Sequence, residues 1–438
     1  MTSSRRQFVA AGLAAAGALW FPGCSSAPRR RAPRDPQQKA RLMVIGVGGR
    51  GGDNLNGVAK EDIVVLCDVD QNILAGAAKR FPGAQLVADY RTILRDAGCV
   101  RDLALDGVVV STPDHTHFLP SMLALQQGLD VYCEKPLTHT IAQARALARE
   151  AEARGAVTQM GIQIHANQNF RRVVEAIAAG AVGTVREVIV FVNGTNWSAT
   201  ALPPTQATPD HVDWELWLGP AGSRGYSDGY HPAGWRRYWA FGGGTTADMG
   251  CHFLDLAFWA LGLDAPTSLL AEGSEPDAEC APPALRCEYS FPSRGARPAV
   301  TVRWHAAGDR PTAALAERGL ESWRNGVLFV GDEGWLVSDY SKHTVGPAAR
   351  AATWAAPMPS LAPSPGHHRE WLQCSALRTE PSCSFAYAVP LTETVLLANV
   401  AFRAARGRRL AWDAAAMRTD DAGANALLDV AARPGFEA

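Results

Sequence analysis

The chain has no marked excess of either charge, because 42 lysines and arginines stand against 43 aspartates and glutamates and leave a formal net charge of −1. This balance gives no general attraction to nucleic acid or to an anionic membrane surface, so we expect no nucleic-acid partner. The nine cysteines include no Cys-x-x-Cys pair, which argues against a zinc ribbon or a thioredoxin-type motif, and most should be buried free thiols. What remains is an ordinary soluble composition, 47% hydrophobic over 438 residues, long enough for two domains.

The amino terminus predicts a targeting segment rather than part of the fold. Arg5 and Arg6 precede a small and apolar stretch at residues 10–21, a pattern that matches a twin-arginine export signal, and the stretch is too short to cross a membrane comfortably. It ends near Cys24 in a sequence that loosely resembles a bacterial lipobox, so a lipid anchor at Cys24 is one alternative and an ordinary arginine-rich start is another. We expect residues 1–40 to be signal and linker, the twin-arginine machinery to be a partner, and the periplasm or cell envelope to be the location.

Residues 41–164 show the pattern of a dinucleotide-binding Rossmann domain. An apolar strand at 41–45 runs into a glycine loop, a helix is expected at 53–60, and a second strand at 63–67 ends before Asp68. Asp68 stands 22 residues after the first loop glycine, the spacing at which a carboxylate binds the adenosine ribose, and this favours NAD. Arg50 or Lys79 would offset the repulsion of a 2′-phosphate, so NADP stays open. The loop residues expected at the cofactor are Gly46, Gly48, Gly49, Arg50 and Gly51.

Strands and helices continue to alternate after Asp68. Strands are expected at 106–111, 131–133 and 157–162, with helices at 119–127 and 141–153 between them. Ligands of doubly wound sheets collect beyond the carboxyl ends of the strands. The two histidines that follow the first of these strands have no third ligand at a recognisable spacing, so we predict no metal. The cofactor-binding residues predicted at these strand ends are Ser111, Thr112, Pro113, His115, His117, Glu134 and Lys135.

A segment from Gly242 to Asp255 carries the strongest signal for acid–base chemistry. Asp248 and His252 are four residues apart, so a helix would place both on one face, together with Asp255 and Trp259. A carboxylate and an imidazole on one stripe can serve as an oriented acid–base pair. The alternative is a capped helix whose polar side chains only satisfy buried backbone groups. The opposite face, which reads as core, carries Met249, Phe253, Leu256, Ala257 and Ala260.

Several of these motifs together resemble the Gfo/Idh/MocA oxidoreductase family. The matching pieces are the glycine loop 46–51 and the segments 111–117, 134–136, 172–187, 242–252 and 390–399. The resemblance implies a doubly wound parallel Rossmann sheet followed, over 165–438, by an α+β domain with an open, mostly antiparallel sheet that commonly forms a homo-oligomer interface. The sequence agrees: strands are expected at 185–192, 286–290, 299–304 and as a pair within 325–339, and helices at 369–374 and 391–405 should pack back against the body.

The same resemblance assigns Lys135, Asp248 and His252 to catalysis. Oxidation of a sugar hydroxyl requires loss of its proton as hydride leaves carbon, and a histidine is a suitable general base at neutral pH. Asp248, directly or through substrate, would orient His252, while Lys135 would stabilise the developing negative oxygen. A loop at 235–239 lines the sugar pocket in similar proteins. The candidate substrate-binding residues are His165, Asn167, Trp235, Arg236, Tyr238 and His252.

These residues predict an exported NAD(P)-dependent oxidoreductase that acts on a sugar, polyol or glycoside. Because the cell envelope has no ready supply of soluble NAD, the cofactor should be tightly held and recycled in place. One alternative is an NAD-dependent glycosidase that oxidises its substrate transiently and eliminates the leaving group, although the presence of Asp248 favours a dehydrogenase. The other alternative is a non-catalytic sugar-binding protein, against which the intact set of Lys135, Asp248 and His252 argues.

Overall fold

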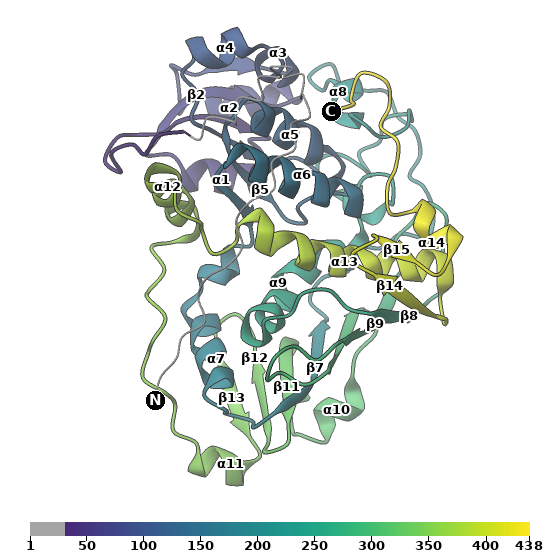
Figure 1. Ribbon diagram of the computed structural model, residues 1–438. Helices are drawn as coiled ribbons and strands as arrows, with labels where there is room; N and C mark the ends of the chain where they lie inside the picture. Colours follow the sequence, from purple (N-terminus) through teal and green to yellow (C-terminus); the bar gives the residue numbers. More distant parts are fainter. Residues whose placement is uncertain (1–30) are drawn as a thin grey trace, which may run out of the picture.

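The computed structural model describes residues 31–438, so the predicted export signal and Cys24 lie outside the described residues. The first domain, coloured purple to blue in Figure 1, contains a six-stranded parallel sheet whose strand order is β3-β2-β1-β4-β5-β6. This is the strand order of a dinucleotide-binding Rossmann fold, and the predicted doubly wound sheet is confirmed. Its elements are β1 Arg41–Ile45, α1 Arg50–Gly57, β2 Asp62–Cys67, α2 Gln71–Ala78, β3 Gln85–Val87, α3 Arg91–Leu94, α4 Ala97–Asp102, β4 Gly107–Val110, α5 Phe118–Gln126, β5 Asp130–Glu134, α6 Ile141–Arg154 and β6 Thr158–Gly161.

The second domain is built on a nine-stranded sheet in the order β13-β12-β11-β7-β10-β9-β8-β14-β15. All neighbouring strands are antiparallel except β7 and β10, so the predicted mostly antiparallel sheet is confirmed. Its strands are β7 Val185–Val192, β8 Ser268–Gly273, β9 Ala284–Phe291, β10 Val300–Ala307, β11 Asn325–Gly331, β12 Trp335–Ser338, β13 His343–Gly346, β14 Arg409–Asp413 and β15 Arg418–Thr419. The helices outside the Rossmann sheet are α7 Gln168–Ala178, α8 Trp214–Leu218, α9 Gly244–Leu261, α10 Thr312–Ala316, α11 Ala348–Thr353, α12 His367–Leu377, α13 Phe385–Ala405 and α14 Ala422–Ala426.

The two faces of the nine-stranded sheet differ in what covers them. Helix α9 contacts β7, β10 and β11 on one face, and α13 contacts β8. On the other face Leu315, in α10, packs with Phe191 and Leu328. Elsewhere this sheet pairs charges across neighbouring strands, as between Arg303 and Glu288. The predicted homo-oligomer through the open face stays a prediction.

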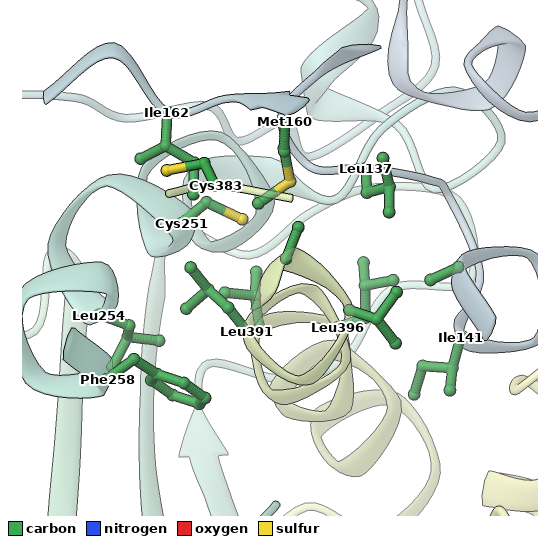
Figure 2. Packing of buried hydrophobic residues seen from close by; sticks show 14 of the residues in the cluster. Leu137, Ile141, Met160, Ile162, Cys251, Leu254, Phe258, Cys383, Leu391 and Leu396 are labelled. Carbon is green, nitrogen blue, oxygen red and sulfur yellow. The ribbon is translucent and has the colours of Figure 1, made fainter. Parts of the chain in front are cut away.

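Helix α13 joins the two domains through its apolar surface. In Figure 2, α13 lies between α9, which contributes Leu254 and Phe258, and the Rossmann domain, which contributes Met160 and Ile141. The helix is long and apolar enough to cross a membrane, yet its most apolar window is 83% buried inside the protein. Its composition therefore reflects contact on all sides, and the shared core holds α9 in place beside the Rossmann sheet.

Helix α12 packs back on the Rossmann domain, as the sequence predicted. Trp371 is buried beside Tyr132, and its indole nitrogen donates to the backbone oxygen of Val157 at 3.2 Å. Just after the helix, Arg378 pairs with Asp130 at 2.6 Å. The Rossmann core is therefore completed by a segment that follows it by more than 200 residues.

Candidate active site

A cavity of about 620 Å³ lies at the carboxyl ends of β1, β2, β4 and β5 and reaches α9 in the second domain. This is the edge at which ligands bind in open α/β sheets. The predicted residues that line it are Gly46, Gly48, Gly49, Arg50, Asp68, Ser111, Thr112, Pro113, His117, Glu134, Lys135, Trp235, Arg236, Asp248 and His252. The tertiary structure thus brings the cofactor loops and the three predicted catalytic residues to a single space.

The glycine loop between β1 and α1 fits a bound pyrophosphate. Gly46 has φ +76°, and a Cβ there would lie 2.8 Å from the backbone oxygen of Ser111. A Cβ at Gly51 would lie 1.9 Å from the backbone oxygen of Gly46, so Gly51 allows α1 to approach the strand and is not itself part of the cavity wall. Helix α1 begins at Arg50, and the backbone N–H groups of Gly49 and Arg50, which have no backbone acceptor among residues 31–438, can bind an anion at its amino terminus.

Asp68 follows β2 and lines the same cavity. Its carboxylate accepts hydrogen bonds from the backbone nitrogens of Val47 at 2.9 Å and Asp70 at 3.0 Å. Arg50 does not neutralise it, because that guanidinium binds Gln163 at 2.7 Å and lies 3.4 Å from Glu134. A free carboxylate suits two ribose hydroxyls and repels a 2′-phosphate, which agrees with the prediction of NAD.

Lys135 and Asp248 form the centre of the charged site. The Lys135 ammonium donates to Asp248 Oδ1 at 2.8 Å and to the Asp248 backbone oxygen at 2.7 Å. Arg236 Nε donates to Oδ1 at 3.2 Å and Trp197 Nε1 to Oδ2 at 2.8 Å. Burial alone would raise the pKa of Asp248, but the charges of Lys135 and Arg236 outweigh it and hold this pKa well below its usual range. Asp248 is therefore a fixed carboxylate that positions Lys135.

His252 lies one helical turn after Asp248 and faces the cavity as a neutral base. Burial, and then the nearby charge of Lys135, lower the pKa of His252 to about 3. Its Nδ1 atom is buried and has no hydrogen-bond partner among residues 31–438. Within that range no hydrogen bond joins His252 to Asp248, whose oxygens are taken by Lys135, Arg236 and Trp197. The expected direct orientation of His252 by Asp248 is thus not made, because Asp248 holds the two cations and the indole instead.

Besides Gly51, four predicted site residues lie away from the cavity wall. His115 belongs to a 3-10 turn at Asp114–Thr116, in which successive side chains point about 120° apart, so its neighbours face the cavity and it does not. His165 Nδ1 lies 3.0 Å from the Asp255 carboxylate, and its ring stacks on Trp259 with centroids 3.9 Å apart. Asp255 and Trp259, which share the predicted helix face with Asp248 and His252, are therefore structural.

The other two have local structural roles. Asn167 caps α7 by accepting a hydrogen bond from the backbone nitrogen of Asn169 at 2.7 Å. Tyr238 is buried against Tyr230, with ring centroids 4.8 Å apart. The structure therefore leaves Trp235, Arg236 and His252 as the predicted substrate residues that reach the cavity.

The cavity also contains residues outside the predicted site. Tyr340, between β12 and β13, stacks on Phe253 at 4.6 Å and lies 6.3 Å from the His252 ring. Its hydroxyl is buried without a partner in the described part of the chain. No local motif marks such residues, because they come from several separate segments of the chain. The further lining residues of this kind are Asp89, Tyr90, Trp217, His231 and Phe436.

Comparison with known proteins decides the family. Residues 40–162 match the NAD-binding Rossmann fold of the Gfo/Idh/MocA oxidoreductase family, and residues 166–291 match its C-terminal alpha/beta domain. The chain belongs to this family. The predicted NAD-binding role of the Gfo/Idh/MocA Rossmann domain is thereby confirmed.

Relatives within the family are known by name. Inositol 2-dehydrogenase 1 of Saccharopolyspora erythraea is 31% identical over 191 residues, which cover 41% of this chain and 54% of that protein. Inositol 2-dehydrogenase of Rubrobacter xylanophilus is 30% identical over 155 residues, 34% of this chain and 43% of that protein. The chain thus spans about half the length of these curated Gfo/Idh/MocA relatives.

Two solved structures share the complete fold. Aldose-aldose oxidoreductase from Caulobacter crescentus, complexed with glycerol, gives a TM-score of 0.57 at 17% identity over 85% of this chain and 100% of that chain. Levoglucosan dehydrogenase, complexed with NADH and levoglucosan, gives a TM-score of 0.56 at 17% identity, and the match covers 85% of this chain and 99% of that chain. These likenesses establish the two-domain Gfo/Idh/MocA fold.

Proposed function

We propose that the protein is an exported NAD-dependent oxidoreductase that oxidises a hydroxyl of a sugar, polyol or glycoside. The observation that carries this proposal is the meeting of Lys135, Asp248 and His252 in the cavity that the glycine loop and Asp68 also line. The named relatives act on inositol and the fold neighbours include sugar oxidoreductases, which supports this substrate class.

Each residue has a distinct part in the reaction. The bound nicotinamide supplies the acceptor for the hydride that leaves the substrate carbon. His252, neutral at physiological pH, takes the proton of the substrate hydroxyl as the carbonyl forms. Lys135 stabilises negative charge on the substrate oxygen. Asp248 holds the Lys135 ammonium in position by accepting its hydrogen bond. Burial lowers the pKa of Lys135, but the negative charge of Asp248 helps to raise it, so the ammonium stays protonated.

Two segments outside the Rossmann sheet support a tightly held cofactor. The first segment lies next to Asp68 and pairs with the chain there through its backbone. The backbone nitrogen of Gln71 donates to the backbone oxygen of His211 at 2.8 Å, and the backbone nitrogen of Asp213 donates to the backbone oxygen of Val69 at 2.9 Å. Residues 433–437, near the chain end marked beside α8 in Figure 1, approach the same edge of the cavity. There Phe436 lines the cavity beneath the Arg91 guanidinium, 4.1 Å away. Because Phe436 lines the cavity that Asp68 also lines, the cofactor should leave slowly and be recycled by a second substrate.

The amino-terminal pattern extends this proposal to the cell envelope. Arg5 and Arg6 direct export through the twin-arginine route, and Cys24 is the residue for a lipid anchor. Export of the folded protein would carry its cofactor along. A retained cofactor fits a reaction in which one sugar is oxidised and another reduced without soluble NAD.

The test uses protein purified after export and then denatured. Mass spectrometry should detect a released nicotinamide cofactor, and a panel of sugars and glycosides should change nicotinamide absorbance and substrate mass by two hydrogens. An empty pocket that also fails to bind added NAD or NADH would overturn the proposal. Release of a sugar and an alcohol from glycosides, with no net redox change, would instead identify bond cleavage.

A further inference from the structure

Asp114 is a buried carboxyl group of the active-site cavity that the proposed reaction does not use. It begins the 3-10 turn that follows β4, is 5% exposed, and lines the cavity. No hydrogen bond within residues 31–438 reaches its carboxyl oxygens, and they are not sealed inside the protein, so they are open to cavity space. A carboxyl that is buried and yet unpaired calls for a partner that the reaction supplies.

The other four carboxylates that line this cavity already have partners. Backbone nitrogens hold Asp68, and two cations hold Asp248. Arg91 binds Asp89 at 2.8 Å, and two amide side chains donate to Glu134 Oε1 at 2.9 and 2.6 Å. Among residues 31–438 this leaves one carboxyl at the cavity that is free to take a proton.

The proposed base, His252, does not keep the proton that it takes. Burial and the charge of Lys135 lower its pKa to about 3. Its Nδ1 atom is sealed and has no partner in the described part of the chain, so the proton has no route through the far side of the ring. The proton must therefore move on within the cavity, to a group that binds it more tightly.

The surroundings of Asp114 allow it to hold a proton at neutral pH. Burial raises its pKa to about 7, although the positive charges of Lys135 and Arg236 act in the opposite direction. The negative charges of Asp248 and Glu134 add to the rise. A carboxyl that is half protonated near pH 7 can both accept and release a proton. Burial lowers the pKa of the three histidines beside it, so they are neutral at this pH. They are His115, His117 and His139.

A second cavity of about 330 Å³ gives the proton a way out. Asp114 lines this cavity as well as the active site, and Val430, which is 57% exposed, lines its outer side. Its other charged residues are Arg224, paired with Glu279 at 3.1 Å, and Arg403. The volume is about ten times the space that one water occupies in the liquid. Water there can carry a proton from the carboxyl to the surface while substrate and cofactor fill the active site.

We propose that Asp114 is the proton relay of the active site, which takes the proton of the substrate hydroxyl after His252 and passes it to water in the second cavity. This role rests on the proposed oxidation. The substrate C–H bond breaks and its hydride goes to the nicotinamide, while the O–H proton goes to His252, then to the Asp114 carboxylate and then to water. When the retained cofactor reduces a second substrate, a proton returns by the same route.

Infrared spectroscopy of the full chain with its cofactor, and without substrate, measures the proton on Asp114 directly. A carboxylic acid C=O stretching band should appear as the pH falls through about 7, and Asp114→Asn should lack it. Asp89→Asn is the matched control and should keep the band, because Asp89 lines the same cavity but binds Arg91. A wild-type spectrum that matches Asp114→Asn across this pH range would overturn the proposal.

The pH profile of turnover tests the relay on the sugar or glycoside that the substrate panel identifies. In wild type, kcat for oxidation should rise as the pH increases through about 7, because the carboxylate form accepts the proton. Asp114→Asn should lose this rise and lower kcat by at least about tenfold, with little change in KM. Asp114→Glu should restore the profile.

Two results would overturn the relay alone. One is wild-type kcat with a wild-type pH profile in Asp114→Asn, and the other is a lower kcat with an unchanged profile, which would identify a structural role. No oxidation of any substrate by wild type would overturn the proposed function and the relay with it, even if the infrared band is present. Thermal unfolding of each variant confirms that it is folded.

Discussion

Lys135 donates to both the carboxylate and the backbone oxygen of Asp248, at 2.8 and 2.7 Å, although 113 residues separate them in the sequence. One comes from the end of a Rossmann strand and the other from the first turns of α9. The pair therefore joins the cofactor-binding domain to the second domain inside the active-site cavity. Its geometry depends on how the two domains pack, and the shared core around α13 fixes that packing.

Replacing Lys135 tests the charge in this pair. Lys135→Met should lower kcat by about 10²–10³-fold, because the developing oxyanion loses its nearest cation. The exposed Lys60→Met is the control and should be neutral. Steady-state kinetics give the rate, and cofactor content of the same preparation separates lost chemistry from lost binding. Activity within a factor of about two of the wild type would contradict the assigned role.

Replacing His252 tests the proton acceptor. His252→Ala should keep the cofactor and lose turnover by about 10²–10⁴-fold, the usual contribution of a general base. The Lys135–Asp248 pair should survive, because His252 donates to neither residue. If His252→Ala keeps both its cofactor and full activity, His252 is not the general base.

The buried, neutral state of His252 predicts an acid-sensitive fold. Its pKa is lowered to about 3 in the folded protein, below the ordinary value of about 6.5, so protons bind the unfolded chain first as the pH falls. Stability is fully present above about pH 6.5 and decreases toward pH 3, by at most about 1.4 kcal/mol per pH unit for this group. Wild type should therefore lose more free energy of unfolding than His252→Gln between about pH 7 and about pH 5.

Urea unfolding at the two pH values measures this difference. His211→Gln, which removes a histidine with a 40% exposed side chain, serves as the control and should keep the wild-type pH dependence. Identical pH dependence in wild type and His252→Gln would show that burial does not exclude the proton.

The segment that covers the adenosine end predicts slow cofactor release. Phe436→Ala should speed dissociation of bound cofactor by about tenfold, because it removes an aromatic wall worth roughly 1–2 kcal/mol. Phe81→Ala is matched, since Phe81 also lies under an arginine, Arg80 at 5.4 Å, but does not line the cavity. Stopped-flow displacement with excess cofactor gives the rates. Equal rates in Phe436→Ala and wild type would contradict a covering role.

The export proposal is tested separately from the chemistry. Exchange of both Arg5 and Arg6 for lysine should leave the protein in the cytoplasm, because the twin-arginine route reads the arginine pair itself. Cell fractionation with an activity assay measures this. Unchanged export of the double variant would rule out the twin-arginine route without affecting the enzymatic proposal.

Local patterns in the sequence predicted much of the Rossmann domain. The strand before Gly46, the spacing to Asp68 and the buried run at Gly107–Val110 have short-range causes, since parallel strands covered on both faces are apolar throughout. The same holds for α9, where a spacing of four residues put Asp248 and His252 on one face. Local spacing could not show that Asp255, two turns along from Asp248, would turn to His165 and away from the cavity.

By itself the sequence determined the fold class and the residues able to bind NAD, because periodicity, glycine loops and strand-end carboxylates act through the nearby chain. Only the tertiary structure decided what those residues touch. Burial beside Lys135 makes His252 a neutral, weak base, and the carboxylate of Asp248 holds Lys135, Arg236 and Trp197. It also turned His115 away from the cofactor cavity, so that its Nε2 lies 3.1 Å from the backbone oxygen of Trp217. Such electrostatics depend on desolvation and on distances between distant segments, which no local pattern encodes.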